Sequence, residues 1–173
     1  MKKDLLVIFS VVLALAVFLG GSKIQSVDEY YLLHIDDVVP DSRTVTVSID
    51  LTSVLEHRDD LDPALLPYLP KDGMLLSPTV YVLREGDTAY DMLSRTVRHN
   101  KIQMEVQGAD KNAFSSVYVL GVGYFYEFSC GEHSGWTYRV NGVYPDVGCS
   151  KYVLSDGDVL EWVYSCSLDA LTA

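Results

Sequence analysis

Residues 134–144 read Ser-Gly-Trp-Thr-Tyr-Arg-Val-Asn-Gly-Val-Tyr, and this stretch predicts a β-strand that ends in a tight turn. Its bulky residues Trp136, Tyr138 and Val140 alternate with polar ones, so a strand would place these three side chains on one face. The Asn141-Gly142 pair is typical of a two-residue hairpin turn, which needs positive φ at both positions. The chain is therefore expected to return beside this strand.

Further strands are expected on both sides of this hairpin. Residues 44–51 alternate strictly between apolar and polar side chains, which is the pattern of a half-buried strand. Shorter segments between turns predict the remaining strands at 79–84, 102–106, 117–120, 124–128 and 158–165. Residues 52–77 contain a short helical turn and then several prolines, so they predict a long ordered loop.

One segment, residues 88–99, has the pattern of an amphipathic helix. Thr88 and Asp91 have the spacing of a capping box, in which each side chain accepts a hydrogen bond from the other residue's main-chain N–H. The apolar stripe comprises Ala89, Met92, Leu93, Thr96 and Val97. The element order ββαβββββ predicts an α+β fold, a β-grasp-like mixed sheet with one main helix packed on one face.

The start of the chain, residues 1–21, predicts a signal peptide or an uncleaved signal anchor. Lys2 and Lys3 precede an unbroken apolar run at 5–19, which is the order of a secretion signal. This N-terminal hydrophobic helix is expected to engage the membrane and to leave the rest of the chain extracytoplasmic, either anchored or secreted. The remaining parts are then an acidic tether at 22–43, the folded domain at 44–166 and a tail at 167–173.

The charge balance narrows the range of functions. With 13 basic and 24 acidic residues, the formal net charge is −11. Such a surface repels nucleic acid, so no nucleic-acid partner is expected. An enzyme is not expected either, because the histidines are scattered and the sequence has no nucleophile-elbow, metalloprotease or phosphate-binding motif.

Three cysteines, Cys130, Cys149 and Cys166, leave three possibilities open. Outside the cytoplasm, two of them could pair in a disulfide and leave one thiol. Alternatively, His133 lies close to Cys130, and these two residues could form a zinc site with the other cysteines. All three could also be buried free thiols. The long gaps between the cysteines lack the paired spacing of structural zinc sites and therefore favour the disulfide.

The segment around the strand at 136–140 resembles a known family. The relevant parts are residues 134–142, Tyr144-Pro145, Gly148-Cys149 and residues 152–162. Together they resemble the transcobalamin-like C-terminal domain, a bacterial domain of unknown function. Residues 84–93 are similar to the strand-to-helix corner of the same family. The resemblance covers residues 44–166 and implies a relationship to the small domain that closes over cobalamin in transcobalamin and intrinsic factor.

The resemblance also implies a ligand site. In the vertebrate carriers a tryptophan of the corresponding strand lies near the corrinoid, and Trp136 is the matching position, although this chain lacks the carriers' large helical domain. We therefore expect an exported cell-surface module that binds cobalamin or another flat ligand together with a surface or transporter protein. The ligand-binding residues are expected to be Trp136, Tyr138, Arg139 and Tyr144. The alternatives are a structural or protein-interaction domain without a small ligand, and a metal-binding domain built from the cysteines and His133.

Overall fold

The computed structural model describes residue 9 and residues 36–112 and 115–167. The chain divides into two units, residues 1–36 and 37–173, and the elements described below belong to the second. In chain order they are β1 (Thr44–Asp50), α3 (Thr52–Glu56), η1 (Pro63–Tyr68), β2 (Met74–Val82), α4 (Ala89–His99), β3 (Met104–Gln107), η2 (Ala109–Lys111), β4 (Tyr118–Val122), β5 (Phe125–Tyr126), β6 (Gly135–Val140) and β7 (Val159–Ser165).

The predicted N-terminal hydrophobic helix, at 5–19, lies outside the described residues except for Phe9. The same holds for residues 22–35 of the predicted tether and 168–173 of the tail. Within the part of the chain that the structure describes, no helix is both long enough and apolar enough to span a bilayer. The first strand begins at Thr44, where the sequence predicts the start of the folded domain.

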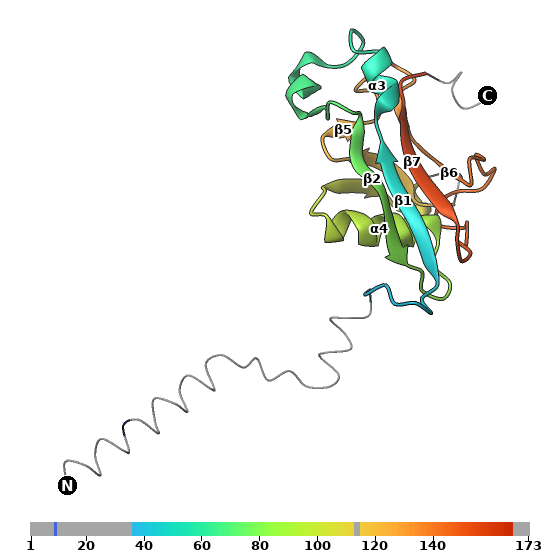
Figure 1. The fold of residues 1–173 in the computed structure, drawn as a ribbon. Helices are drawn as coiled ribbons and strands as arrows, with labels where there is room; N and C mark the ends of the chain where they lie inside the picture. The colour runs from blue at the N-terminus through green and yellow to red at the C-terminus, as the bar shows by residue number, and fades with distance from the viewer. Residues whose placement is uncertain (1–8, 10–35, 113–114, 168–173) are drawn as a thin grey trace. The chain divides into compact units, whose positions relative to one another are not determined.

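The larger sheet has four strands in the order β2-β1-β7-β6 (Figure 1). The first and last strands of the chain, β1 and β7, run parallel in its centre, and each outer strand runs antiparallel to its neighbour. One face of β1, β7 and β6 is buried, and its residues are Val45, Val47, Ile49, Leu160, Trp162, Tyr164, Trp136, Tyr138 and Val140. The core therefore lies on one side of this sheet.

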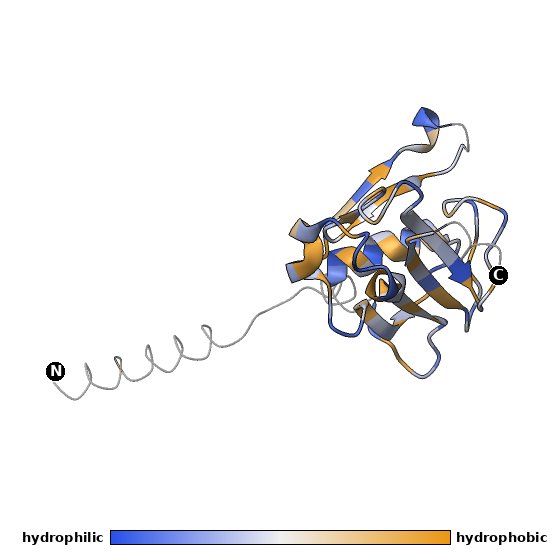
Figure 2. Cartoon of the chain, turned by 90° about the horizontal axis from the view of Figure 1, so that it is seen from above, coloured by the Kyte–Doolittle hydropathy of each residue, from blue (hydrophilic) through white to orange (hydrophobic). Residues whose placement is uncertain are grey.

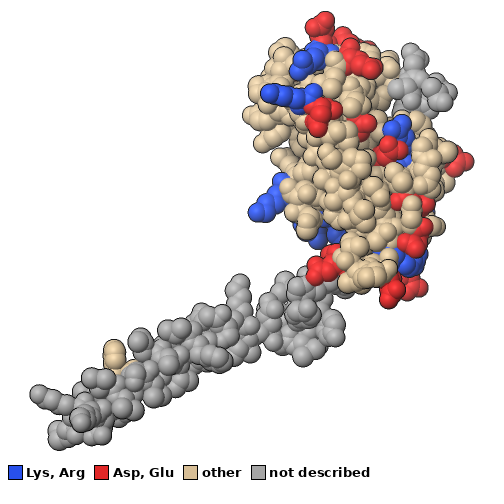
Figure 3. Space-filling model, in the orientation of Figure 1, with Lys and Arg blue, Asp and Glu red and all other residues tan. Residues whose placement is uncertain are grey.

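The opposite face of the larger sheet is more polar and mostly half-buried or exposed, although Ser48 of β1 is buried there. Hydrophobic and hydrophilic residues alternate along the strands, as the colouring of Figure 2 shows. Outward residues of the two central strands include Thr46 and Glu161, both half-buried. In Figure 3 the charged side chains lie mainly around the margin of the domain and leave a broad uncharged area between them.

The predicted helix forms as α4, with its capping box. The Thr88 side chain accepts a hydrogen bond from the Asp91 N–H at 3.2 Å, and the Asp91 carboxylate accepts one from the Thr88 N–H at 3.0 Å. The predicted stripe is buried, and it comprises Ala89, Met92, Leu93, Thr96 and Val97. The apolar residues of this stripe belong to the same core cluster as the buried residues of β1 and β7.

A second sheet, in the order β3-β4-β5, corrects the expectation of a single mixed sheet. The three strands were predicted close to where they form, but they pair with one another. Gly123, with φ +62°, reverses the chain so that β5 returns onto β4. Side chains then join the sheets: the Trp136 indole N–H donates to the Phe125 carbonyl at 2.8 Å, and the Tyr164 hydroxyl donates to the Tyr126 carbonyl at 2.6 Å. The fold is thus α+β with two sheets.

The predicted turn at Asn141-Gly142 forms, but the predicted return strand after it is wrong. Both turn residues have positive φ, 53° and 79°, and only an isolated bridge links Val143 back to β6. Pro145 then lacks the N–H that a continuing ladder would need. The Asn141 N–H instead donates to the Val159 carbonyl at 2.9 Å, which ties the turn to β7. As a result β6 pairs with β7 along one edge only.

The segment at 52–77 contains more structure than the predicted loop. It holds α3, η1 and the first part of β2. The Asp62 side chain caps η1 by accepting from the Ala64 N–H at 2.9 Å. Gly73, with φ +74°, turns the chain, and the Leu51 N–H donates to its carbonyl at 2.6 Å. This contact brings the chain alongside β1 early, so β2 begins at Met74 rather than at residue 79.

Candidate functional site

A groove with a volume of about 460 Å³ lies between β4 and β6. Its lining residues are Ser116, Val117, Tyr118, Val119, Trp136, Thr137, Tyr138, Pro145, Asp146, Val147, Gly148, Cys149, Lys151 and Trp162. The volume falls within the range of about 300–1,000 Å³ that is usual for small-ligand sites. We call this hollow the β4–β6 groove.

Runs of consecutive residues line the groove, which identifies its walls as strand edges. Residues 116–119, which lead into β4 and include its first two residues, form one wall, and residues 136–138 of β6 form another. The loop at 145–149 also lines the groove. Neighbouring side chains of a strand point to opposite faces, so only the edge can present three residues in a row. A second hollow of about 270 Å³ shares Tyr118, Trp136 and Thr137 with the groove and extends toward the start of β6. The edge of β6 that faces away from β7 is therefore open along most of its length.

Trp136 and Tyr138, two of the predicted ligand-binding residues, both line the groove but are tightly packed. Their exposed fractions are 8% and 7%. The Tyr138 hydroxyl donates to the Val147 carbonyl at 2.6 Å, and its ring lies 5.5 Å from that of Trp162, measured between centroids. Burial raises the pKa of Tyr138. Because both rings are held in place in this way, little of either ring face is available to a flat ligand.

The other two predicted ligand-binding residues lie elsewhere. Arg139 is on the opposite face of the sheet, where its Nε and Nη2 atoms donate to the two carboxylate oxygens of Glu161, each at 2.8 Å. Such a two-pronged pair fixes the guanidinium and occupies its planar edge. Tyr144 follows the hairpin turn, is half-buried, and does not line the groove. The structure therefore brings together two of the four predicted residues.

The cysteines form one disulfide, Cys130–Cys166, and leave Cys149 as a buried free thiol. This confirms the disulfide alternative and selects the pair. The bond joins the loop before β6 to the end of β7, beside the buried Ser134 hydroxyl, which accepts from the Cys130 N–H at 2.9 Å. Among the described residues, no three His, Cys, Asp or Glu side chains are placed to hold a metal ion. The alternative set with His133 is thus not assembled, since two of its thiols are joined to each other.

We expect the Cys149 thiol to react slowly in the folded chain, and we expect its deprotonation at high pH to lower the free energy of unfolding. Its sulfur lies 3.2 Å from the Val117 carbonyl, and burial raises its pKa from 9.0 to about 11. At pH 8 alkylation by iodoacetamide should be roughly 100-fold slower than in the denatured chain, because the thiolate is the reactive form. The folded state keeps a proton that the unfolded state releases, so stability is complete below pH 9 and declines as the pH rises through about 11.

Thermal melts from pH 7 to 11 measure this decline, and Cys149→Ala is the matched control. The variant should lose the earliest part of the alkaline destabilisation and keep the later part. The later part comes from Tyr118, whose pKa is raised to about 12 by burial and by Glu127, and from the buried phenols of Tyr138 and Tyr164. Fast alkylation of the folded chain at pH 8 would contradict the buried position of the thiol.

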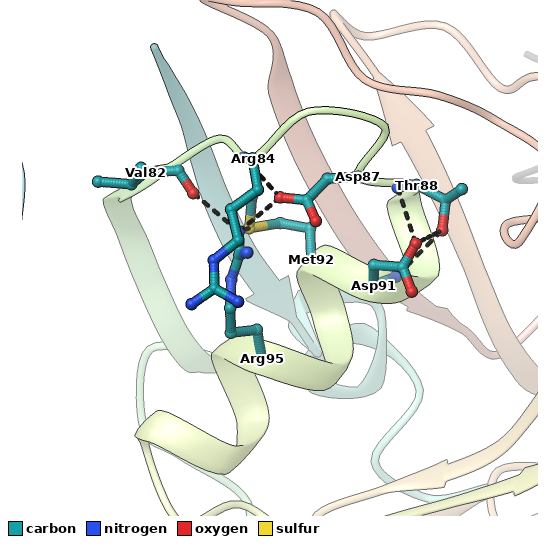
Figure 4. Close-up of polar contacts among 7 residues, drawn as sticks. All are labelled: Val82, Arg84, Asp87, Thr88, Asp91, Met92 and Arg95. Atoms are coloured by element: carbon teal, nitrogen blue, oxygen red, sulfur yellow. Dashed lines mark hydrogen bonds and ion pairs between the residues drawn. The ribbon is translucent and has the colours of Figure 1, made fainter. Parts of the chain in front are cut away.

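A second polar cluster lies at the corner between β2 and α4 (Figure 4). Arg95 reaches back from the helix, and its Nη2 atom donates to the Asp87 carboxylate and to the Val82 carbonyl, each at 2.7 Å. The same Asp87 oxygen accepts from the Arg84 N–H at 2.7 Å. A hollow of about 230 Å³ is lined by Arg84, Asp87, Asp91, Ser94, Arg95 and Arg98. Arg95 and Asp87 form an ion pair that links the helix to the turn after β2, so the main effect of this cluster is to hold the corner.

Arg95→Met is expected to reduce the free energy of unfolding by about 2–3 kcal/mol, because it leaves a largely buried carboxylate without its charged donor. The side chains of Arg95 and Asp87 are only 18% and 11% exposed. Arg98→Met, on the same helix but exposed, is the matched control and should change stability by less than about 0.5 kcal/mol. Urea denaturation of both variants gives the comparison. If both variants lost the same stability, the contacts of Arg95 with Asp87 and Val82 would stabilise the fold no more than an exposed arginine does.

Several groove residues were not predicted from the sequence. Residues 116–119, Cys149 and Trp162 line the groove because two separate sheets meet there, and no local pattern indicates that meeting. The glycine at position 148 is the one sequence feature that reflects this meeting, since in the structure a Cβ atom there would lie 2.2 Å from the Ser116 side chain. A glycine is therefore needed where the 145–151 loop passes close to the start of β4.

Comparisons with known proteins find similarity between part of the chain and a family of unknown function. The chain spans 96% of the length of a candidate metal-binding protein from Ruminococcus gnavus whose crystal structure is known, with 12% sequence identity, 71% of this chain covered and a TM-score of 0.42. No curated protein matches the sequence. The comparisons do not confirm the resemblance to transcobalamin-like domains. Residues 86–165, from the turn before α4 to the end of β7, match the family described as Domain of unknown function (DUF4430).

Proposed function

We propose that this chain is a non-catalytic binding module that acts outside the cytoplasm and holds its ligand in the β4–β6 groove. The observation that carries the proposal is the groove itself, a hollow of about 460 Å³ bounded by two strand edges. A disulfide between Cys130 and Cys166 supports an oxidising compartment. The start of the sequence also supports export, because Lys2 and Lys3 precede the apolar run at 5–19 in the order of a secretion signal.

The shape of the groove favours a narrow ligand over a macrocycle. A corrinoid could stack on these aromatic rings only if their faces were exposed, whereas Trp136 and Tyr138 are 8% and 7% exposed. Cobalamin could therefore touch this domain only along one side, and a second protein would have to supply the rest of its site. A surface or transporter protein is the kind of partner that an exported module of this type would need.

Tryptophan fluorescence tests this proposal directly. The chain has two tryptophans, and both Trp136 and Trp162 line the groove. A ligand in the groove should therefore change the emission of the full chain, and cyanocobalamin and short peptides are the probes to titrate. Val147→Asp, at an exposed apolar residue of the groove, should weaken any such binding at least tenfold.

Val153→Asp is the matched control, since Val153 is 59% exposed and lies outside the groove. It should leave the titration unchanged. If neither probe changes the emission at millimolar concentration, the groove is not a ligand site. If both variants weaken binding equally, the ligand lies elsewhere on the surface.

A protein-interaction surface without a small ligand is the second candidate, and a specific observation favours it. Figure 3 shows a broad area without charged side chains, although the whole chain carries 24 acidic residues. On the outward side of the larger sheet, Val80 and Val159 are 50% and 40% exposed. Exposed apolar residues on a polar protein mark sites where another protein can pack.

A further inference from the structure

We infer that the β4–β6 groove takes an extended peptide, which adds to the larger sheet as a strand beside β6. This inference rests on the proposed function, because it names the class of ligand for the same groove. The argument starts from the main-chain hydrogen bonds of β6, which determine what a ligand at this edge must offer.

The main-chain groups of successive β6 residues point alternately toward β7 and toward the groove. The Asn141 N–H donates to the Val159 carbonyl at 2.9 Å, so Asn141 faces β7. Counting back in twos, Arg139 and Thr137 face β7 as well. The N–H and carbonyl groups of Trp136 and Tyr138 therefore point away from β7, toward the groove that both residues line.

The groove-facing edge is paired at its two ends and unpaired in the middle. At the start of β6, the Ser134 carbonyl accepts from the Phe128 N–H at 3.0 Å. At its end, Val140 and Val143 exchange two main-chain hydrogen bonds, at 2.9 and 3.0 Å. For the two groove-facing residues between them, the described part of the chain offers no main-chain partner. Two N–H donors and two carbonyl acceptors are thus available at strand spacing.

The two edges of the larger sheet differ in how they are protected. The outer edge of β2 carries Pro78 within an irregular register opposite β1, and both features hinder pairing with another strand. The edge of β6 has no proline, and its pairing with β7 continues regularly from Gly135 to Val140. Pairing with an added strand is hindered at the β2 edge, whereas the β6 edge lies in a groove that can admit one.

Trp162 supplies a further unpaired donor in the same place. It lies on β7, opposite Tyr138, and it also lines the groove. Its indole Nε1 is buried and has no hydrogen-bond partner among the described residues. A buried N–H without an acceptor is costly, and a carbonyl oxygen is the kind of group that would remove the cost. A peptide main chain carries such oxygens at regular intervals.

Charge indicates the flanks of this peptide. Asp146 and Lys151, which carry opposite charges, both line the groove, whereas Glu132 lines the continuing hollow beside the start of β6. The whole chain has a net charge of −11, so its field attracts positive ligands. The ligand is therefore an extended peptide with small or apolar residues in the middle and basic residues at its ends.

Three synthetic peptides test this inference on the full chain. The first is acetyl-Lys-Thr-Val-Thr-Val-Thr-Lys-amide, the second has glutamates in place of the lysines, and the third is the first with alternate amides N-methylated. The basic peptide should slow amide hydrogen exchange at Trp136 and Tyr138 at least tenfold, as NMR measures. Exchange at Thr137 and Arg139 should not change, because their amides already face β7. The glutamate peptide should bind at least tenfold more weakly. The N-methylated peptide should not slow exchange at all, because the peptide amides that would face β6 can no longer donate hydrogen bonds.

The outcomes separate this inference from the proposed function. If cyanocobalamin changes the tryptophan emission and no peptide slows exchange at Trp136 and Tyr138, the groove is a ligand site but not a peptide site. If the methylated peptide binds as well as its parent, main-chain pairing is overturned. If the two amides are already protected in the free chain, a second copy or residues 168–173 occupies the edge. A dilution series and a chain that ends at Ser167 identify which, and either result overturns the inference.

Discussion

Reduction of the Cys130–Cys166 disulfide is expected to lower the free energy of unfolding by roughly 4 kcal/mol, which is the entropy that a cross-link of this span removes from the unfolded chain. The two cysteines are 36 residues apart, and the loop they close includes all of β6 and all of β7. Guanidinium denaturation with and without dithiothreitol measures the loss. A loss of this size is a large part of the stability of a typical domain.

Variants identify the bond responsible for this loss. Cys166→Ala should reproduce the reduced state and should no longer respond to dithiothreitol. Cys149→Ala keeps both disulfide cysteines and should respond as the natural chain does. If the natural chain has the same stability with and without reductant, the cross-link does not constrain its unfolded state. If Cys149→Ala loses the response, the pairing involves Cys149 instead.

Trp162→Ala is expected to cost about 3–5 kcal/mol, as truncations of large buried aromatic side chains do. Trp162 is 2% exposed and lies in the centre of the larger sheet, between Ile49 on β1 and Tyr138 on β6. Its removal leaves a cavity at the point where the groove meets the core. Circular dichroism during urea denaturation measures the change, provided that the variant still folds.

Trp162→Phe serves as the control and as the second variant if the alanine variant does not fold. It keeps an aromatic ring in the core and loses no hydrogen bond, since the Trp162 Nε1 has no partner among the described residues. It should therefore cost less than half as much as Trp162→Ala. Trp136→Phe, by contrast, removes the 2.8 Å bond to the Phe125 carbonyl and should lose about 1 kcal/mol for that bond alone. A phenylalanine at 162 as damaging as an alanine would show that the indole N–H has a partner.

The local elements could be predicted from the sequence because local physics fixes them. The spacing of Thr88 and Asp91 determines where α4 begins, and its buried stripe follows the helical period. Strict alternation identifies β1 within one residue of its observed end. Asn141-Gly142 predicts the turn after β6, since both residues adopt positive φ there. Each of these predictions depends on contacts between residues that are close in the chain.

The pairing of strands could not be predicted in the same way. The sequence after the turn suggested a return strand, but Pro145 ends that pairing after one bridge, and β7 becomes the partner of β6. The three strands between α4 and β6 form their own sheet, because the chain reverses at Gly123. Strand alternation shows which side chains share a face, but it does not show which strand lies beside which.

The candidate site was half predicted for the same reason. Trp136 and Tyr138 were identified from their strand and do line the groove. Arg139 alternates with them and so lies on the other face, paired with Glu161. The second wall of the groove and the thiol of Cys149 come from distant parts of the chain. Only the three-dimensional arrangement brings them together.

The parallel pairing of β1 with β7 also determines when this domain can fold. Residues 46 and 159 are partners in the centre of the sheet, although they come from opposite ends of the domain's sequence. Contacts between such distant residues form slowly, because a long loop must close first. During synthesis the central pair of strands cannot assemble until residues 159–165 have left the ribosome. The larger sheet is therefore completed only after the final strand of the domain has been made.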